Sequence, residues 1–278
     1  MDRWPDGRYR VGISGWRYAP WRKVYYPEGL PQRAELEYAS GRLNSIELNG
    51  SFYSLQRPSS YQRWYDETPD GFVFSVKGPR FVTHMKKLVD VDAPMANFFA
   101  SGVLALGNKL GPVLWQLPPN LGYDADRCGP FFESLPRTTA AAAEVAKGHD
   151  ERMEGRALLE CSVDIPLRHA IEVRHSSFET KEFVELCRAY DIALVCADTA
   201  GKWPMFGDVT SDFAYVRLHG AEELYVSGYD DESLDHWARK IRSWKRDTYV
   251  YFDNDVKVRA PFDAEALAQR LKIRKAGR

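Results

Sequence analysis

The sequence predicts an α/β fold, a (β/α)8 barrel formed by a single domain over residues 1–278. Eight short runs rich in β-forming residues recur along the chain, and segments with helical periodicity separate most of them. The length of 278 residues and a hydrophobic content of 44% are sufficient for one large core. An open, doubly wound parallel sheet is the structural alternative. Eight evenly spread strands favour the closed barrel.

The predicted strands share alternating or continuous apolar residues bounded by turn-forming residues. They are residues 10–15, 45–50, 72–78, 111–118, 169–175, 193–198, 214–220 and 248–255.

Helical periodicity fills most of the gaps between these strands, and the predicted helices are residues 33–41, 59–68, 94–111, 181–191, 233–244 and 263–276. We expect Gly111 to end the third of them. Two departures from a regular barrel are predicted. The Ala-rich residues 138–157 indicate an extra helix between the fourth and fifth strands. Residues 199–212 contain Pro and Gly without helical periodicity, so the sixth helix is expected to be reduced or missing.

The overall charge and the cysteine pattern exclude several classes of protein. A net charge of −1 means that any binding of phosphate or nucleic acid would require a local basic patch. The four cysteines form no CxxC pair and are expected to be reduced. No signal-peptide core and no apolar stretch of membrane-spanning length occurs. A cytoplasmic protein without an obligate protein partner is therefore expected.

The alternation of side chains along each strand predicts an unusual barrel interior. In residues 169–175, Ile171 and Val173 suit the outer face, which turns Glu172 and Arg174 inward. The same test applied to the other strands gives an inward set of polar residues: Glu47, Asn49, Lys77, Gln116, Glu172, Arg174, Asp198, Arg217 and His219. In the eighth strand the alternation is ambiguous, and either Asp253 or Asn254 could point inward.

These polar residues cluster toward the carboxyl ends of the strands, where barrel proteins bind their ligands. Two interpretations remain open. The cluster is a binding or catalytic site, or its carboxylates neutralise Lys77, Arg174 and Arg217 in a closed network that is only structural.

The loops that follow the strands add aromatic and basic residues to the predicted mouth of the barrel. The aromatic and histidine residues in question are Trp16, Tyr18, Phe52, Tyr53, His84 and Trp203. Aromatic rings beside Arg and Lys suit a planar or sugar ring that carries an anionic group, including a nucleotide or single-stranded nucleic acid. Alternatively, these rings pack the loops onto the barrel.

A metal centre is not predicted, although potential ligands are present. Histidines and carboxylates occur near the expected mouth, but Lys77, Arg174 and Arg217 would repel a cation and compete for the carboxylates. No HxH or HxxxH spacing occurs, nor do the glycine-rich signatures of nucleotide-binding proteins or the GxSxG of hydrolases. No cofactor is therefore expected.

Eight ordered motifs carry a resemblance to a known family: "GISGWRYAPW", "IELNGSFYSL", "FSVKGPRFVTHMKKL", "GPVLWQLPPN", "IEVRHSSF", "VCADTAGKWP", "AYVRLHG" with "YVSGY", and "VYFDND". Together they resemble the YecE-like family, also called domain of unknown function 72, over nearly the whole chain. The resemblance implies a TIM barrel distantly similar to AP endonucleases and xylose isomerases. It implies no established activity, and the dense metal-ligand set of the endonucleases is absent here.

The sequence thus predicts an enzyme that binds a phosphate- or carboxylate-bearing sugar, nucleotide or nucleic-acid fragment. Lys77, Arg174 and Arg217 would hold the anion. Trp16, Tyr18 and Phe52 would stack on the ring. The predicted proton-transfer residues are Glu172, Glu47, His219, His175 and Asp198. Asn49, Gln116, Tyr53, His84, Trp203 and Asp253 complete the predicted binding set. Phosphoester hydrolysis is the first expectation for the reaction. One alternative is isomerase or lyase chemistry on a sugar acid or sugar phosphate. The other is non-catalytic binding of nucleotides or nucleic acid.

Overall fold

The computed structural model of the chain describes residues 8–273. Its sheet is parallel and has the strand order β6-β5-β4-β3-β2-β1-β9-β8-β7. The strands are β1 (Tyr9–Ser14), β2 (Ser45–Leu48), β3 (Val73–Lys77), β4 (Leu110–Gln116), β5 (His169–Glu172), β6 (Ala193–Leu194), β7 (Cys196–Asp198), β8 (Phe213–Leu218) and β9 (Asp247–Phe252).

The two strands at the ends of this order, β6 and β7, are halves of one extended segment interrupted only at Val195. One half pairs with β5 and the other with β8, so the order returns to its own beginning. The sheet is a nearly closed barrel of eight parallel strands. All eight predicted strands are present, and the predicted barrel is confirmed.

The helices occupy most of the predicted gaps. They are α1 (Glu35–Ser40), α2 (Gly50–Tyr53), α3 (Pro58–Asp66), α4 (Asp92–Ala100), α5 (Ala125–Ser134), α6 (Thr139–Ala146), α7 (Lys181–Ala189), α8 (Asp231–Trp244) and α9 (Ala260–Arg270). The extra helix between the fourth and fifth strands is α6, and residues 199–212 contain no helix, both as predicted. Helices α2 and α5 were not predicted.

One helix prediction is wrong. Residues 94–111 do not form one helix that ends at Gly111, because Gly111 lies within β4. Helix α4 ends at Ala100, and Gly102 then adopts a left-handed backbone with a φ of 108°. The 3-10 turns η4 (Val103–Lys109) follow. A Cβ at Gly102 would lie 2.4 Å from the Cα of Pro58, so only glycine allows this close approach.

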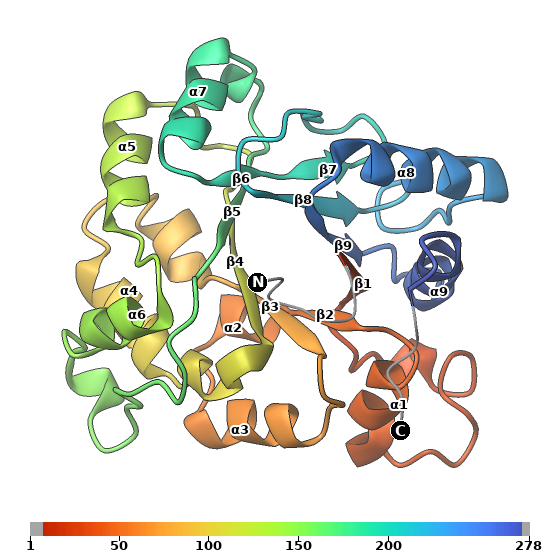
Figure 1. The fold of residues 1–278 in the computed structure, drawn as a ribbon, viewed down its shortest axis with the longest axis horizontal. Coiled ribbons are helices and arrows are strands. Elements are labelled where there is room, and N and C mark those ends of the chain that lie inside the picture. Colours follow the sequence, from red (N-terminus) through yellow and green to blue (C-terminus); the bar gives the residue numbers. More distant parts are fainter. Residues whose placement is uncertain (1–7, 274–278) are drawn as a thin grey trace. The chain divides into compact units, whose positions relative to one another are not determined.

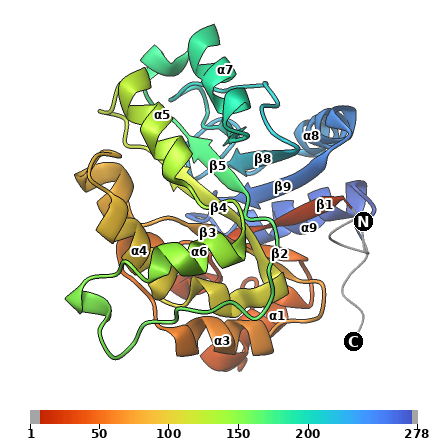
Figure 2. The same ribbon diagram turned by 60° about the vertical axis from the view of Figure 1, so that its left-hand side comes forward.

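Contacts divide the chain into two compact parts, which are described separately. The first part comprises residues 1–47, 68–73 and 193–278, and the second comprises residues 48–67 and 74–192. In the first part, α8 and α9 pack together and α9 packs on β1 and β9 (Figure 1). In the second, α4 packs on α6, and β4 pairs with β5 beside α5 (Figure 2). A single domain over residues 1–278 stays a prediction.

Candidate functional site

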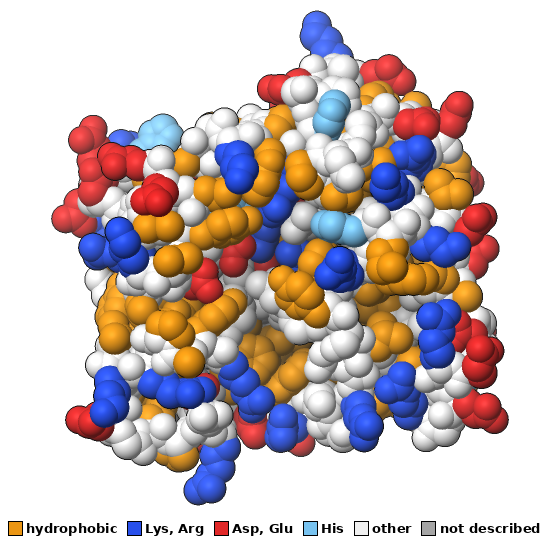
Figure 3. All heavy atoms as spheres, turned by 180° about the vertical axis from the view of Figure 1, so that it is seen from behind, with side chains coloured by type: hydrophobic (Ala, Val, Ile, Leu, Met, Phe, Trp, Pro, Cys, Tyr) orange, Lys and Arg blue, Asp and Glu red, His pale blue; other side chains and the backbone are white. Residues whose placement is uncertain are grey.

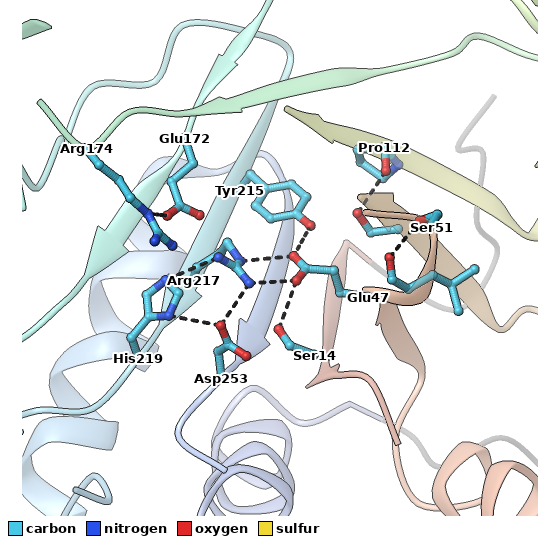
Figure 4. Close-up of polar contacts among 12 residues, drawn as sticks. Ser14, Glu47, Ser51, Pro112, Glu172, Arg174, Tyr215, Arg217, His219 and Asp253 are labelled. Carbon is cyan, nitrogen blue, oxygen red and sulfur yellow. Dashed lines mark hydrogen bonds and ion pairs between the residues drawn. The ribbon is translucent and has the colours of Figure 1, made fainter. Parts of the chain in front are cut away.

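A buried ion pair between Glu47 and Arg217 organises the polar interior of the first part. Nε of Arg217 donates to Oε2 of Glu47 at 3.1 Å, and Nη2 donates to Oε1 at 2.8 Å. The hydroxyls of Tyr215 and Ser14 donate to the same carboxylate, at 2.7 and 2.9 Å (Figure 4). Both carboxylate oxygens therefore accept two hydrogen bonds, and Glu47 and Arg217 are fully buried. This geometry favours a structural role for Glu47 over the predicted proton transfer.

Asp253, and not Asn254, is the residue after β9 that contacts Arg217 and His219. Its Oδ2 accepts from Nη2 of Arg217 at 3.0 Å and lies 3.1 Å from Nδ1 of His219 (Figure 4). Nη1 of Arg217 lies 3.4 Å from Nε2 of His219. Because arginine only donates, Nε2 of His219 takes part in this contact as an acceptor. Asn254 instead donates to Asp263 and to the Ser227 carbonyl.

Three carboxyl groups of the first part, those of Asp198, Asp255 and Asp263, have raised pKa values. Oδ2 of Asp198 accepts from the hydroxyl of Tyr229 at 3.1 Å, and burial raises the pKa of Asp198. Burial, followed by the charge of Asp253, raises the pKa of Asp255 to about 6. Asp255 and Tyr229 were not predicted as site residues. The "DND" directly after β9 was the available signal for Asp255, but the sequence does not show how far each of the two aspartates is removed from solvent.

The second part contains a cluster of its own, at the carboxyl ends of β3 and β5. Nε of Arg174 donates to Oε1 of Glu172 at 2.8 Å, and this carboxylate is buried (Figure 4). Nζ of Lys77 lies 4.3 Å from the centre of the Phe52 ring, in a cation–π contact. The Phe52 ring lies edge-on to His84, with 5.1 Å between ring centres. We name these five residues the basic cluster.

The basic cluster changes the titration of its histidine. The pKa of His84 is lowered from 6.5 to about 4, first by burial and then by the charges of Lys77, Arg174 and Arg80. Nδ1 of His84 lies 2.9 Å from the Thr83 hydroxyl. The ring is therefore neutral at pH 7 in a positive electrostatic environment, which an anion would compensate.

Helix α2 holds the Phe52 end of this cluster in place. The Ser51 hydroxyl donates to the Lys77 carbonyl at 2.6 Å, which ties α2 to the end of β3. Asn49 immediately precedes α2, and its Oδ1 is buried without a hydrogen-bond partner among residues 8–273. A buried acceptor without a partner is costly, and the ligand-binding role of Asn49 stays a prediction.

The remaining predicted residues have different surroundings. Gln116 is buried at the end of β4 and donates to the Leu117 carbonyl. His175 is half-buried, and its Nδ1 accepts from the backbone N–H of Ser177, capping the short helix η6 (Ser176–Phe178). Trp203 donates its backbone N–H to the Thr199 hydroxyl. Tyr53 is 71% exposed.

The aromatic residues of the first loop pack largely on one another. Trp16 is buried, and its carbonyl accepts from the hydroxyl of Tyr26. Tyr18 donates to the Ser14 carbonyl and lies 4.8 Å from Trp21, measured between ring centres. These contacts match the alternative in which the rings pack the loop onto the barrel, and the stacking role predicted for Trp16 and Tyr18 stays a prediction.

On the face drawn in Figure 3, basic, acidic and hydrophobic side chains are interspersed. Within residues 8–273, no three His, Cys, Asp or Glu side chains are grouped closely enough to hold a metal ion. In the same range, no helix combines the length and apolar character needed to cross a membrane.

Comparison with known proteins identifies the family. UPF0759 protein YunF of Bacillus subtilis is 32% identical over 299 residues, covering 96% of this chain and 96% of YunF. UPF0759 protein YecE of Escherichia coli K12 is 24% identical over 249 residues, covering 87% of this chain and 84% of YecE. A solved DUF72 family protein from Thermotoga maritima superposes with a TM-score of 0.76 at 25% identity, covering 96% of this chain and all of that one. The family described as "Protein of unknown function DUF72" matches residues 10–278, and the chain belongs to this family.

Proposed function

We propose that this protein is an enzyme that binds a phosphate- or carboxylate-bearing small molecule at the basic cluster. The convergence of Lys77, Arg80 and Arg174 around the neutral His84 ring carries the proposal. Glu172 offsets only part of this positive charge. A phosphate oxygen would gain charge-assisted hydrogen bonds from the cations.

The bound anion would also prepare His84 for catalysis. A base with a pKa near 4 accepts protons poorly at pH 7, whereas an adjacent anion favours the imidazolium form and raises its pKa. His84 would thus become an effective proton-transfer group only when the ligand is in place. Phosphoester hydrolysis is the first reaction to test, with His84 activating water and the cations stabilising the charge that develops on phosphate.

One observation favours a second reaction class. Glu172 is buried and fixed by Arg174 in the same cluster as His84, so two proton-transfer groups share one site. Such a pair suits an isomerase or lyase that removes a proton from a sugar phosphate and returns it elsewhere. Two assays distinguish these classes. Hydrolysis of p-nitrophenyl phosphate esters would support phosphoester hydrolysis, and loss or exchange of a carbon-bound proton from sugar phosphates would support isomerase or lyase chemistry.

Binding is tested first with inorganic phosphate. The C2 proton of His84, assigned by its loss in His84→Gln, should titrate near pH 4 without phosphate. Saturating phosphate should raise that pKa by roughly one unit or more. Lys77→Met should weaken phosphate binding at least tenfold, whereas Lys86→Met, which removes an exposed lysine two residues after His84, should not. An unchanged His84 titration with phosphate would overturn the proposal.

The enzymatic step is tested with Glu172→Gln. If the proposal holds, this change removes turnover and preserves phosphate binding. If instead it lowers only the free energy of unfolding, Glu172 belongs to a structural ion pair.

A further inference from the structure

A cavity of about 400 Å3 lies in the second part of the chain, beside the basic cluster. Its walls include Phe52, Tyr53, Arg80, Phe81, Met85 and Arg152. This volume falls within the range of pockets that bind small organic molecules.

Two residues connect the cavity to the basic cluster. Phe52 lines the cavity and also contacts Lys77 and His84. Arg80 lines the cavity, and its charge contributes to the lowered pKa of His84. A ligand whose anionic group is held at the basic cluster could therefore extend into the cavity.

The charge within the cavity is limited. Arg152 pairs with Asp150 through Nε and Nη2, the latter at 2.6 Å from Oδ2, which holds the pKa of Asp150 at about 2. The guanidinium of Arg152 also lies 5.8 Å from the centre of the Phe81 ring. Arg80 forms no ion pair with another residue in the described range 8–273. The rest of the lining is largely aromatic and aliphatic, which suits a flat ring better than a polyhydroxylated chain.

The exposure of the apolar lining indicates that it is not core packing. Tyr53 is 71% exposed and Met85 is 64% exposed, so both side chains present apolar surface to solvent. Large apolar side chains exposed together around a cavity are typical of ligand-binding surfaces. The flexible methionine side chain adapts its shape to a ligand, and its sulfur makes favourable contacts with aromatic rings.

The backbone of the cavity wall is irregular in a way typical of binding sites. Phe81–Met85 form the π-helix η3, and Lys87, Leu88 and Asp90 then adopt left-handed conformations with φ of 51°, 68° and 52°. The left-handed conformation is strained for a residue other than glycine. Strained segments and π-helical turns are concentrated at functional sites.

We propose that the cavity is a subsite for a planar heteroaromatic ring, so that the ligand of this protein is a nucleoside phosphate. This inference rests on the proposed function, because the phosphate is held at the basic cluster. The ring lies among Phe52, Phe81 and Met85, and Arg80 stands where the two regions meet.

The test compares three probes by titration calorimetry: inorganic phosphate, ribose 5-phosphate and adenosine 5′-monophosphate. Adenosine 5′-monophosphate should bind about tenfold to hundredfold more tightly than ribose 5-phosphate, which is the effect expected of stacking one base. The double variant Phe81→Leu with Met85→Ala should reduce that ratio at least threefold and leave ribose 5-phosphate affinity unchanged. Met205→Ala removes another exposed methionine, in the first part of the chain, and should leave the ratio unchanged.

The outcomes separate the two proposals. Equal affinities for ribose 5-phosphate and adenosine 5′-monophosphate, with binding still dependent on Lys77, would overturn the ring subsite and leave the proposed function intact. No binding of any of the three probes would overturn both. An unchanged melting temperature of the double variant shows that a lost ratio does not come from unfolding.

Discussion

At the scale of single residues, Glu47 and Glu172 are two buried carboxylates that pair with arginine. Glu47 accepts four hydrogen bonds from three residues, and Glu172 accepts a hydrogen bond from Arg174, two residues further along the chain. A carboxylate with every acceptor position occupied holds its surroundings rigidly, as Glu47 does.

Glu47→Gln should lower the free energy of unfolding by about 3–5 kcal/mol, because it removes the fully buried carboxylate that pairs with Arg217 and leaves only the more exposed Asp253 to offset the guanidinium charge. Urea denaturation measures the effect. Glu144→Gln, which breaks the exposed pair with Lys147, serves as the control and should cost less than about 1 kcal/mol. Equal losses in the two variants would contradict the structural role assigned to Glu47.

The residues that the sequence placed correctly are those whose surroundings follow from strand alternation. Glu47 and Arg217 face one another as that alternation requires. Asp253 could not be chosen over Asn254, because "FDND" lacks alternating apolar residues. The lowered pKa of His84 could not be predicted either. It depends on burial and on the charges of Lys77 in β3, Arg174 after β5 and Arg80 after β3, which are brought together only by the fold.

At the scale of elements, the helix that ends early shows how tertiary contact overrides a local pattern. Residues 94–111 read as one helix, but the chain must turn where α3 begins at Pro58. The helix α2 was missed for a related reason. Its four residues are too few for a periodic signal, and the hydrogen bond from Ser51 to β3 stabilises it.

Gly102→Ala should destabilise the protein by at least about 2 kcal/mol, because it combines a positive φ with a clash against Pro58. Gly29→Ala is the matched control. Gly29 also has a positive φ, of 82°, but an added Cβ would meet nothing within 4 Å. Gly29→Ala should therefore lower the free energy of unfolding only through the strain of the positive φ, by about 1 kcal/mol. Thermal unfolding of both variants measures the difference, and equal shifts would show that the contact with Pro58 is unimportant.

At the scale of the whole molecule, stability depends on a histidine outside the basic cluster. His169 is fully buried in β5, where Nδ1 accepts from Nε1 of Trp115 at 3.2 Å and Nε2 donates to the Pro136 carbonyl at 2.8 Å. Burial lowers its pKa from 6.5 to about 3. Between these values the unfolded chain binds a proton that the folded protein does not. The neutral, buried ring of His169 therefore stabilises the folded protein fully above pH 6.5, and this stabilisation is lost as the pH falls.

Each pH unit of acidification well below pH 6.5 should therefore cost up to about 1.4 kcal/mol of unfolding free energy through His169. Urea denaturation between pH 7 and 5 should show a shallower pH dependence for His169→Gln than for the natural chain. His236→Gln alters a surface histidine and should preserve the natural slope. Parallel curves for all three proteins would show that His169 does not couple folding to pH.

The ion pair between Glu47 and Arg217 also has a consequence for strand register. Its hydrogen bonds join residues of β1, β2 and β8, and Asp253, directly after β9, adds a fourth segment. A slip of one residue in β8 would turn Arg217 toward the helices and leave the Glu47 carboxylate without its cation. An apolar interior tolerates such a slip better, because one branched side chain can replace another. The charged interior therefore selects one register among several that hydrophobic burial alone would accept.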